Sequence, residues 1–233
     1  MELLTFGDTG WGDEMLRGAG VTILLAVGAY LFGIVVGMGG AAMKLSGSGL
    51  LRGIAGVYTT VVRGVPELLV IYLLFYGSTP LIIDLASLFG YTGYLEIPPF
   101  LAGLLAVGLI SGAYSTEVLR GAMQVIPAGQ VEAGRAVGLS ARQVFFRIKL
   151  PQLWRYALPG LGNVWQLTLK DTALVSVISL AELMQIASIA GNSEREPFIF
   201  YIAAGMLYLV MTTFSQIIFQ RSERVANRGV RRA

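Results

Sequence analysis

Apolar residues gather in five long segments that are separated by shorter polar stretches. A helix needs roughly 20 mostly apolar residues to cross a bilayer. The segments run about 19–43, 56–76, 99–121, 156–180 and 197–219. The fourth is the least hydrophobic because it contains Asn163, Gln166, Lys170 and Asp171. This pattern predicts an all-α membrane protein with five transmembrane helices, formed by residues 1–233 as a single domain.

The polar stretches alternate in charge, and this alternation predicts the orientation of the chain. Positive residues concentrate on the cytoplasmic side of membrane proteins. The basic stretches follow the first, third and fifth segments, and they contain Lys44, Arg52, Arg135, Arg142, Arg147, Lys149, Arg155, Arg221, Arg224, Arg228, Arg231 and Arg232. The other stretches are richer in acids, with Glu2, Asp8, Asp13, Glu14, Asp84, Glu96, Glu194 and Glu196. We therefore expect a periplasmic N-terminus and a cytoplasmic C-terminus. The first residues lack the basic start of a secretory signal, so the first segment is expected to stay as a membrane helix.

Composition narrows the functional classes. Charged residues make up 13% of the chain, against about 25% in a soluble domain, and hydrophobic residues make up 55%. The chain has neither cysteine nor histidine. It therefore lacks thiolate ligands, disulfides and the commonest catalytic base and metal ligand. The sequence predicts no catalytic, cofactor-binding or metal-binding residue.

Two pairs of glycines recur at a spacing of four inside the predicted membrane helices. They are Gly33 with Gly37 and Gly108 with Gly112. Small residues at this spacing allow helix backbones to approach closely in lipid. We expect packing within this chain, with a dimer interface as the alternative.

The stretch from Pro127 to Pro151 is too charged to span the membrane and too apolar for a plain linker. Pro127 can open a helix over 130–137, which Gly138 closes as a left-handed cap. Ser140 is a good N-cap for a second helix over 141–150, which Pro151 is expected to end. The stretch therefore predicts two short helices joined by a tight turn. From these residues alone, an amphipathic lipid anchor and a protein-docking element are equally good readings.

The residues of this loop resemble the EAA loop of permease subunits of ATP-binding-cassette (ABC) importers. The matching positions are Glu132-Ala133-Gly134, then Gly138, then Ile148 to Pro151, with Gly134 in place of an alanine. Three further stretches are similar to signatures of polar amino acid permeases. They are Tyr58 to Glu67, Gly112 to Gly121 and Leu169 to Ser176. The resemblance covers nearly the whole chain and is strongest to the membrane subunits of histidine, lysine, arginine, ornithine and opine importers.

This resemblance implies a permease subunit that forms half of a translocation pathway in the bacterial inner membrane. The implied partners are an ABC ATPase dimer, a second permease that is identical or a sibling, and a periplasmic substrate-binding protein. The implied cargo is a basic or polar amino acid or an opine, and the partner ATPase would use the ATP. The implied ATPase-coupling residues are Glu132, Ala133, Gly134, Arg135, Gly138, Leu139, Ile148 and Pro151. The chain itself lacks a P-loop, because Met43 precedes Lys44 and Leu45 follows it.

Charged residues inside the predicted spans are candidates for the pathway, because a buried charge in lipid is costly. Arg63 with Glu67, and Glu117 with Arg120, have the spacing of helical ion pairs, which is the alternative reading. Lys170 and Asp171 point about 100° apart on a helix. The candidate pathway residues are Arg63, Glu67, Tyr114, Glu117, Gln166, Lys170 and Asp171. Glu182, which follows the fourth span, is expected at the membrane interface.

Two other functional classes remain as alternatives. An ion-coupled secondary transporter would use the buried carboxylates, but the single elaborate loop argues against it. A membrane assembly protein without transport is disfavoured by the polar fourth span.

Overall fold

The computed structural model of the chain describes residues 2–7, 10–88 and 97–227. These residues form helices and turns, without a strand among them. The predicted charges at Asp8, Glu96, Arg228, Arg231 and Arg232 lie outside the described residues. The elements are η1 (Glu2–Leu4), α1 (Gly12–Lys44), α2 (Gly49–Gly64), α3 (Glu67–Leu88), α4 (Pro99–Val125), α5 (Ala128–Ala136), α6 (Ala141–Val144), η2 (Phe145–Lys149), α7 (Leu150–Asp171), η3 (Thr172–Ile178), α8 (Leu183–Glu194) and α9 (Pro197–Ala226).

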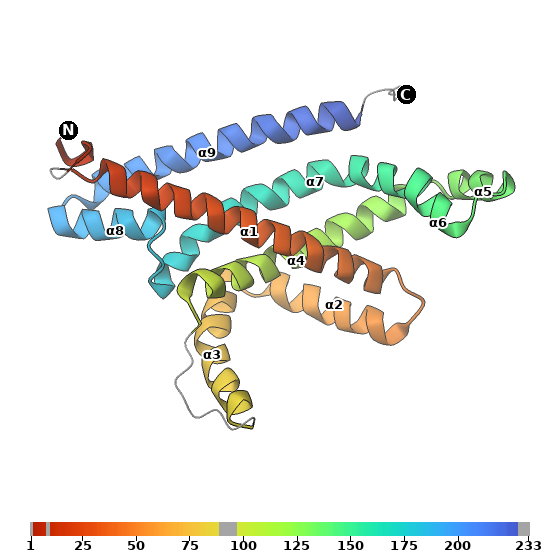
Figure 1. The fold of residues 1–233 in the computed structure, drawn as a ribbon, viewed down its shortest axis with the longest axis horizontal. Helices are drawn as coiled ribbons and strands as arrows, with labels where there is room; N and C mark the ends of the chain where they lie inside the picture. Colours follow the sequence, from red (N-terminus) through yellow and green to blue (C-terminus); the bar gives the residue numbers. More distant parts are fainter. Residues whose placement is uncertain (1, 8–9, 89–96, 228–233) are drawn as a thin grey trace.

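The long helices α1, α4, α7 and α9 run along the length of the molecule, with α5 and α6 at one end (Figure 1). Among the described residues, α1, α4 and α9 are each long and apolar enough to cross a membrane. Two bent helix pairs raise the number of candidate spans to five if each pair counts as one. The first, third and fifth predicted spans therefore lie within single helices, whereas the second and fourth lie within the bent pairs.

The second predicted span is broken at Val65 and Pro66, where the axes of α2 and α3 differ by 111°. Pro66 has no backbone N–H, and it disfavours helical geometry at the residue before it. Val65 is accordingly extended, with φ −107° and ψ 143°. The helix resumes when Val70 donates a backbone hydrogen bond to the Pro66 carbonyl at 3.2 Å. As a result, α3 projects away from the bundle (Figure 1).

The glycine pairs pack α1 against α4 within this chain, as predicted. A Cβ at Gly37 would lie 2.6 Å from the Ser115 Cβ, and one at Gly108 would lie 2.5 Å from Cδ1 of Phe32. Real Cβ atoms do not approach this closely, so only glycine allows the two helices to lie at this separation.

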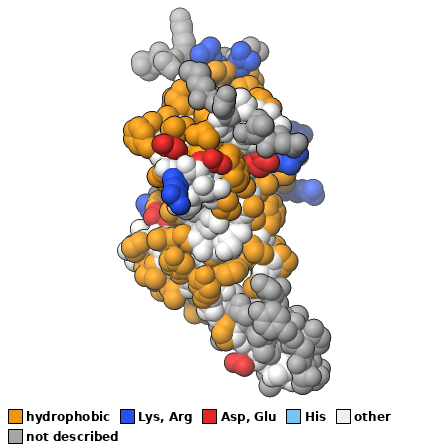
Figure 2. All heavy atoms as spheres, turned by 90° about the vertical axis from the view of Figure 1, so that its left-hand side faces the viewer, with side chains coloured by type: hydrophobic (Ala, Val, Ile, Leu, Met, Phe, Trp, Pro, Cys, Tyr) orange, Lys and Arg blue, Asp and Glu red, His pale blue; other side chains and the backbone are white. Residues whose placement is uncertain are grey.

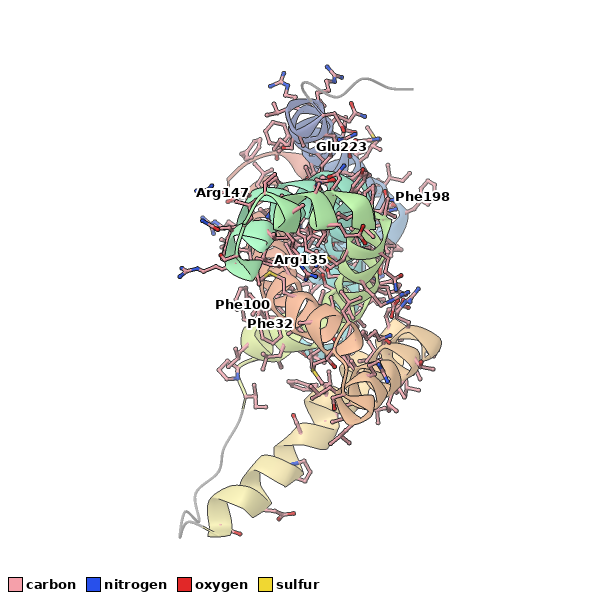
Figure 3. All side chains as sticks on the ribbon, turned by 90° about the vertical axis from the view of Figure 1, so that its right-hand side faces the viewer. Phe32, Phe100, Arg135, Arg147, Phe198 and Glu223 are labelled. Carbon is pink, nitrogen blue, oxygen red and sulfur yellow. The ribbon has the colours of Figure 1, made fainter. Side chains whose placement is uncertain are left out.

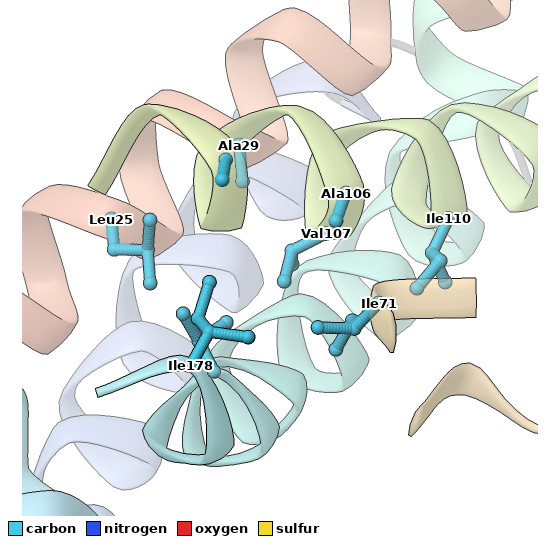
Figure 4. Packing of buried hydrophobic residues seen from close by; sticks show 9 residues of the cluster. Leu25, Ala29, Ile71, Ala106, Val107, Ile110 and Ile178 are labelled. Carbon is cyan, nitrogen blue, oxygen red and sulfur yellow. The ribbon is translucent and has the colours of Figure 1, made fainter. Parts of the chain in front are cut away.

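An apolar core fills the space between α1, α3, α4 and η3. Leu25, Ala29, Val107, Ile110 and Ile178 lie in this core and are buried. Figure 4 shows them converging with Ile71 from the start of α3. The outer faces of α1 and α9 instead carry exposed leucine, isoleucine, valine and phenylalanine side chains, which suits contact with lipid.

The end of the molecule that lies opposite α5 and α6 contains the starts of α1 and α9 together with α8. Figure 2 shows acidic and basic side chains gathered on this end, between apolar surfaces. Inside it, the Glu182 carboxylate is fully buried. It caps α8 by accepting the Gln185 backbone N–H at 2.8 Å, and it accepts the hydroxyls of Thr22 at 3.1 Å and Tyr208 at 3.2 Å. This carboxylate therefore joins α1, α8 and α9 inside the protein, and its expected position at the depth of the membrane interface stays a prediction.

Candidate functional site

The resemblance to the EAA loop falls on a hairpin made of α5, α6 and η2. Gly138 closes α5 in the left-handed region, with φ +85°. The Leu139 N–H bonds to the Gly134 carbonyl and the Gly138 N–H to the Arg135 carbonyl, both at 3.0 Å. This is the bonding expected of a glycine-terminated helix. The predicted left-handed cap at Gly138 is confirmed.

The second arm of the hairpin begins with a capping box at Ser140. Its hydroxyl accepts the Gln143 N–H at 3.3 Å, and the Gln143 side chain accepts the Ser140 N–H at 2.8 Å. The predicted N-cap is confirmed, and the turn between the two arms is fixed at both of its ends.

The predicted end of this helix at Pro151 is wrong, because the chain stays helical into α7. The residues of η2 form a π-helical turn, in which the Leu150 N–H bonds to the Phe145 carbonyl five residues earlier. Pro151 then falls in the first turn of α7, where its missing N–H is tolerated. The hairpin is consequently continuous with the long helix α7.

The candidate coupling residues divide between two sides of the hairpin. Gly134 is buried, and a Cβ there would lie 2.5 Å from Cδ1 of Ile148 and 3.6 Å from Cδ1 of Leu139. The small size of Gly134 therefore serves packing inside the hairpin. Glu132, Ala133, Arg135, Gly138 and Pro151 are exposed instead. A hydrogen bond between the side chains of Gln130 and Gln152 further ties α5 to α7.

The structure brings several of the predicted pathway residues together where α2, α3, α4 and α7 meet. The Arg63 guanidinium lies 5.2 Å from the centre of the Tyr114 ring, and the Tyr114 hydroxyl donates to Glu67 at 3.3 Å. Asp171 is near enough to interact electrostatically with Glu67. The alternative of an Arg63–Glu67 helical ion pair is not formed, because the chain breaks between these two residues.

Glu117 is held by two cations. Arg120 contacts its Oε2 at 2.9 Å, and Lys44 contacts its Oε1. Lys44 also donates to the Thr59 hydroxyl at 2.5 Å, so this cluster joins α1, α2 and α4. The ion pair between Glu117 and Arg120 matches the helical spacing. The role of Lys44 was missed, because only the fold brings it to a partner 73 residues away.

Gln166 and Lys170 lie elsewhere, in a polar groove of about 320 Å³ between α7 and α9. Asn163 also lines it from α7, so these three residues share a face, and α9 contributes Gln216, Gln220 and Glu223. Figure 3 labels Glu223 on α9. The Gln166 side-chain oxygen is buried and has no hydrogen-bond partner among the described residues. The three α9 residues were not predicted as candidates, although their i, i+4, i+7 spacing in the sequence places them on one face of a helix.

Comparison with known proteins places the chain in a family. Residues 15–227 match the family described as binding-protein-dependent transport system inner membrane component. The octopine transport system permease protein OccQ of Rhizobium radiobacter is 50% identical over 231 residues, covering 99% of this chain and 98% of that protein. The histidine/lysine/arginine/ornithine permease protein HisQ of Escherichia coli is 42% identical over 224 residues, covering 96% of this chain and 98% of HisQ.

A solved structure supports the same assignment. A chain of the crystal structure of an amino acid ABC transporter with histidines is similar, with a TM-score of 0.78 and 31% identity. The match covers 92% of this chain and 94% of that one. The chain therefore belongs to the family of binding-protein-dependent transport system inner membrane components.

Proposed function

We propose that this chain is the transmembrane permease subunit of an ATP-driven importer of amino acids or opines. The similarity to OccQ and HisQ over almost the full length of all three chains carries this proposal. The whole chain acts as one membrane domain with five spans, a periplasmic N-terminus and a cytoplasmic C-terminus. The distribution of basic residues supports that orientation.

The hairpin of α5, α6 and η2 is the element that docks on the partner ATPase. Its exposed outer side offers Glu132 and Arg135, which can form charge-assisted hydrogen bonds with a partner, and the small Ala133, which allows a close approach. Its inner side is packed through Gly134 and Ile148. Because η2 continues into α7, a movement imposed on the hairpin would pass directly to a membrane helix.

The translocation pathway is lined by the polar groups at membrane depth. Glu67 and Asp171 supply the carboxylates that a cationic substrate requires, with Tyr114 and Arg63 beside them. The groove between α7 and α9 adds Gln166 and Lys170. Such groups do not face lipid, so water, substrate or a partner subunit must cover them. Glu117 belongs to the same set, but Lys44 and Arg120 neutralise it.

The chain supplies half of the importer. A second permease, identical or a sibling, supplies the other half, and a periplasmic binding protein delivers the cargo. Two ABC ATPase subunits bind and hydrolyse ATP at the cytoplasmic face of the bacterial inner membrane. The permease chain holds no ATP site, because its sequence lacks a P-loop.

Uptake by the reconstituted complex tests this function. The tagged chain, purified from its host with its native partners, is placed in liposomes that contain or lack internal ATP. Uptake of labelled arginine and octopine is measured with the binding protein outside. We expect uptake of at least one of them, and only with ATP. Uptake driven by a proton or sodium gradient without any ATPase would instead establish a secondary transporter, and recovery of the chain without any transport would favour an assembly protein.

A further inference from the structure

A second cavity lies away from the pathway, at the end of the molecule where the hairpin joins the bundle. Its volume is about 180 Å³, and its lining is almost wholly apolar. Side chains from the ends of α1 and α4 meet those of η2 and α7 around it, including Met38, Leu45, Leu119, Met123, Phe145 and Trp154. None of these residues belongs to the candidate pathway or to the predicted coupling set.

The cavity opens to the outer surface of the bundle. The side chains of Phe145 and Trp154 are 39% and 40% exposed, and Met38 and Leu45 are exposed beside them. Half-exposed aromatic rings at the ends of membrane helices are typical of the level of the lipid headgroups. This position allows a lipid to enter the cavity from the side.

Two cations flank the residues of η2 and α7 that line the cavity. Phe145 and Leu150 both line it and lie one π-helical turn apart. Lys149 immediately precedes Leu150, and Arg142 lies about one turn before Phe145, so both lie beside the residues that line the cavity. The Arg142 guanidinium is 5.9 Å from the centre of the ring of Phe146, the residue that follows Phe145. Arg147 follows Phe145 by two residues and so points to the opposite side of the helix. Figure 3 shows Arg147 at the outer edge of the molecule.

Among the described residues, Arg142 and Lys149 form no ion pair. The ion pairs within residues 2–7, 10–88 and 97–227 are those that Lys44 and Arg120 make with Glu117. No aspartate or glutamate occurs between Glu132 and Asp171 in the sequence. The segment beside the cavity is therefore apolar and aromatic on one side and positively charged at its rim.

We propose that this cavity binds an anionic phospholipid of the cytoplasmic leaflet, with part of an acyl chain inside it and the phosphate between Arg142 and Lys149. Basic pockets between membrane helices on the cytoplasmic side suit anionic headgroups. The leaflet assignment rests on the orientation given in the proposed function. Because η2 is the part of the docking hairpin that continues into α7, the bound lipid contacts the segment that transmits the movement of the ATPase.

Fluorescence quenching of Trp154 tests the lipid site directly. The chain has three tryptophans, so replacing Trp11 and Trp165 with phenylalanine leaves Trp154 as its only tryptophan. Subtracting the emission of a complex that also carries Trp154→Phe removes the signal of the partner subunits. The complex containing this variant is reconstituted in mixtures of phosphatidylcholine and phosphatidylglycerol, one of which carries brominated acyl chains. We expect brominated phosphatidylglycerol to quench more strongly than its mole fraction predicts. Equal quenching by the two lipids would overturn the proposal.

Charge-removing variants then locate the headgroup. Arg142→Gln and Lys149→Gln should each lower the preference for phosphatidylglycerol about fivefold, the effect of one cation at an anionic surface. Arg147→Gln removes the same charge from the same turn of helix and should keep the preference. An equal loss in Arg147→Gln would show general attraction of basic residues to the bilayer and refute a site. Quenching requires neither ATP nor transport, so this result is independent of the uptake assay.

Discussion

Gly138 is the residue whose backbone conformation most constrains the docking hairpin. A side chain at φ +85° is strained, and the left-handed region costs an L-residue roughly 1–2 kcal/mol. We expect Gly138→Val to loosen the turn and reduce the amount of ATPase that copurifies with the tagged chain. Gly39→Val is the matched control, because that glycine is exposed and helical, lies outside the hairpin, and a Cβ there would meet nothing within 4 Å. Unchanged ATPase recovery with Gly138→Val would argue against docking through this hairpin.

Glu67 and Asp171 are the residues on which the proposed substrate contacts depend. Removing either negative charge, by Glu67→Gln or Asp171→Asn, should reduce ATP-driven uptake of arginine about tenfold or more, which corresponds to roughly 1.4 kcal/mol of lost interaction. Asp84→Asn is the control, because that carboxylate is exposed on α3 outside the cluster. Initial rates over a range of substrate concentrations provide the measurement. If both variants take up arginine at the wild-type rate, the two carboxylates do not contribute to the substrate pathway.

At the scale of elements, the close packing of α1 against α4 depends on glycines at their contact. Gly37→Leu places a side chain against Ser115 and Thr116, where no space exists, and should lower stability by roughly 1–3 kcal/mol or more. Gly39→Leu lies two residues away in open space and faces outward, so it should leave stability unchanged. Thermal unfolding of the two variants in the same detergent compares them. A similar melting temperature for both would mean that α1 does not pack here.

The elements also show how far the sequence could predict this structure. Local signals were sufficient at Gly138 and Ser140, because helix caps act on their own neighbours. They failed at Pro151, because the residues before it form a π-helical turn and the chain stays helical through the proline. They did not reveal the partners of Lys44 and Glu182, which lie far along the chain and meet these residues only after the helices have packed. Sequence patterns therefore predicted which polar residues lie inside the spans. Only the fold shows that Glu117 belongs to a cluster of ion pairs, that Glu67 and Asp171 lie near each other, and that Gln166 and Lys170 line a separate groove.

At the scale of the whole molecule, the proposed orientation fixes which end meets the ATPase, and it is open to a direct test. The chain contains no cysteine, so single cysteines can report the side of the membrane. Gly47→Cys, between α1 and α2, and Ser193→Cys, at the end of α8, both lie at exposed positions. The basic loops predict that Gly47 is cytoplasmic and Ser193 periplasmic. A membrane-impermeant maleimide should therefore label Ser193→Cys in cells whose outer membrane alone is permeabilised, and label Gly47→Cys only after lysis. The reverse pattern would place the docking hairpin outside the cell, where no ATP is available, and would exclude its coupling role.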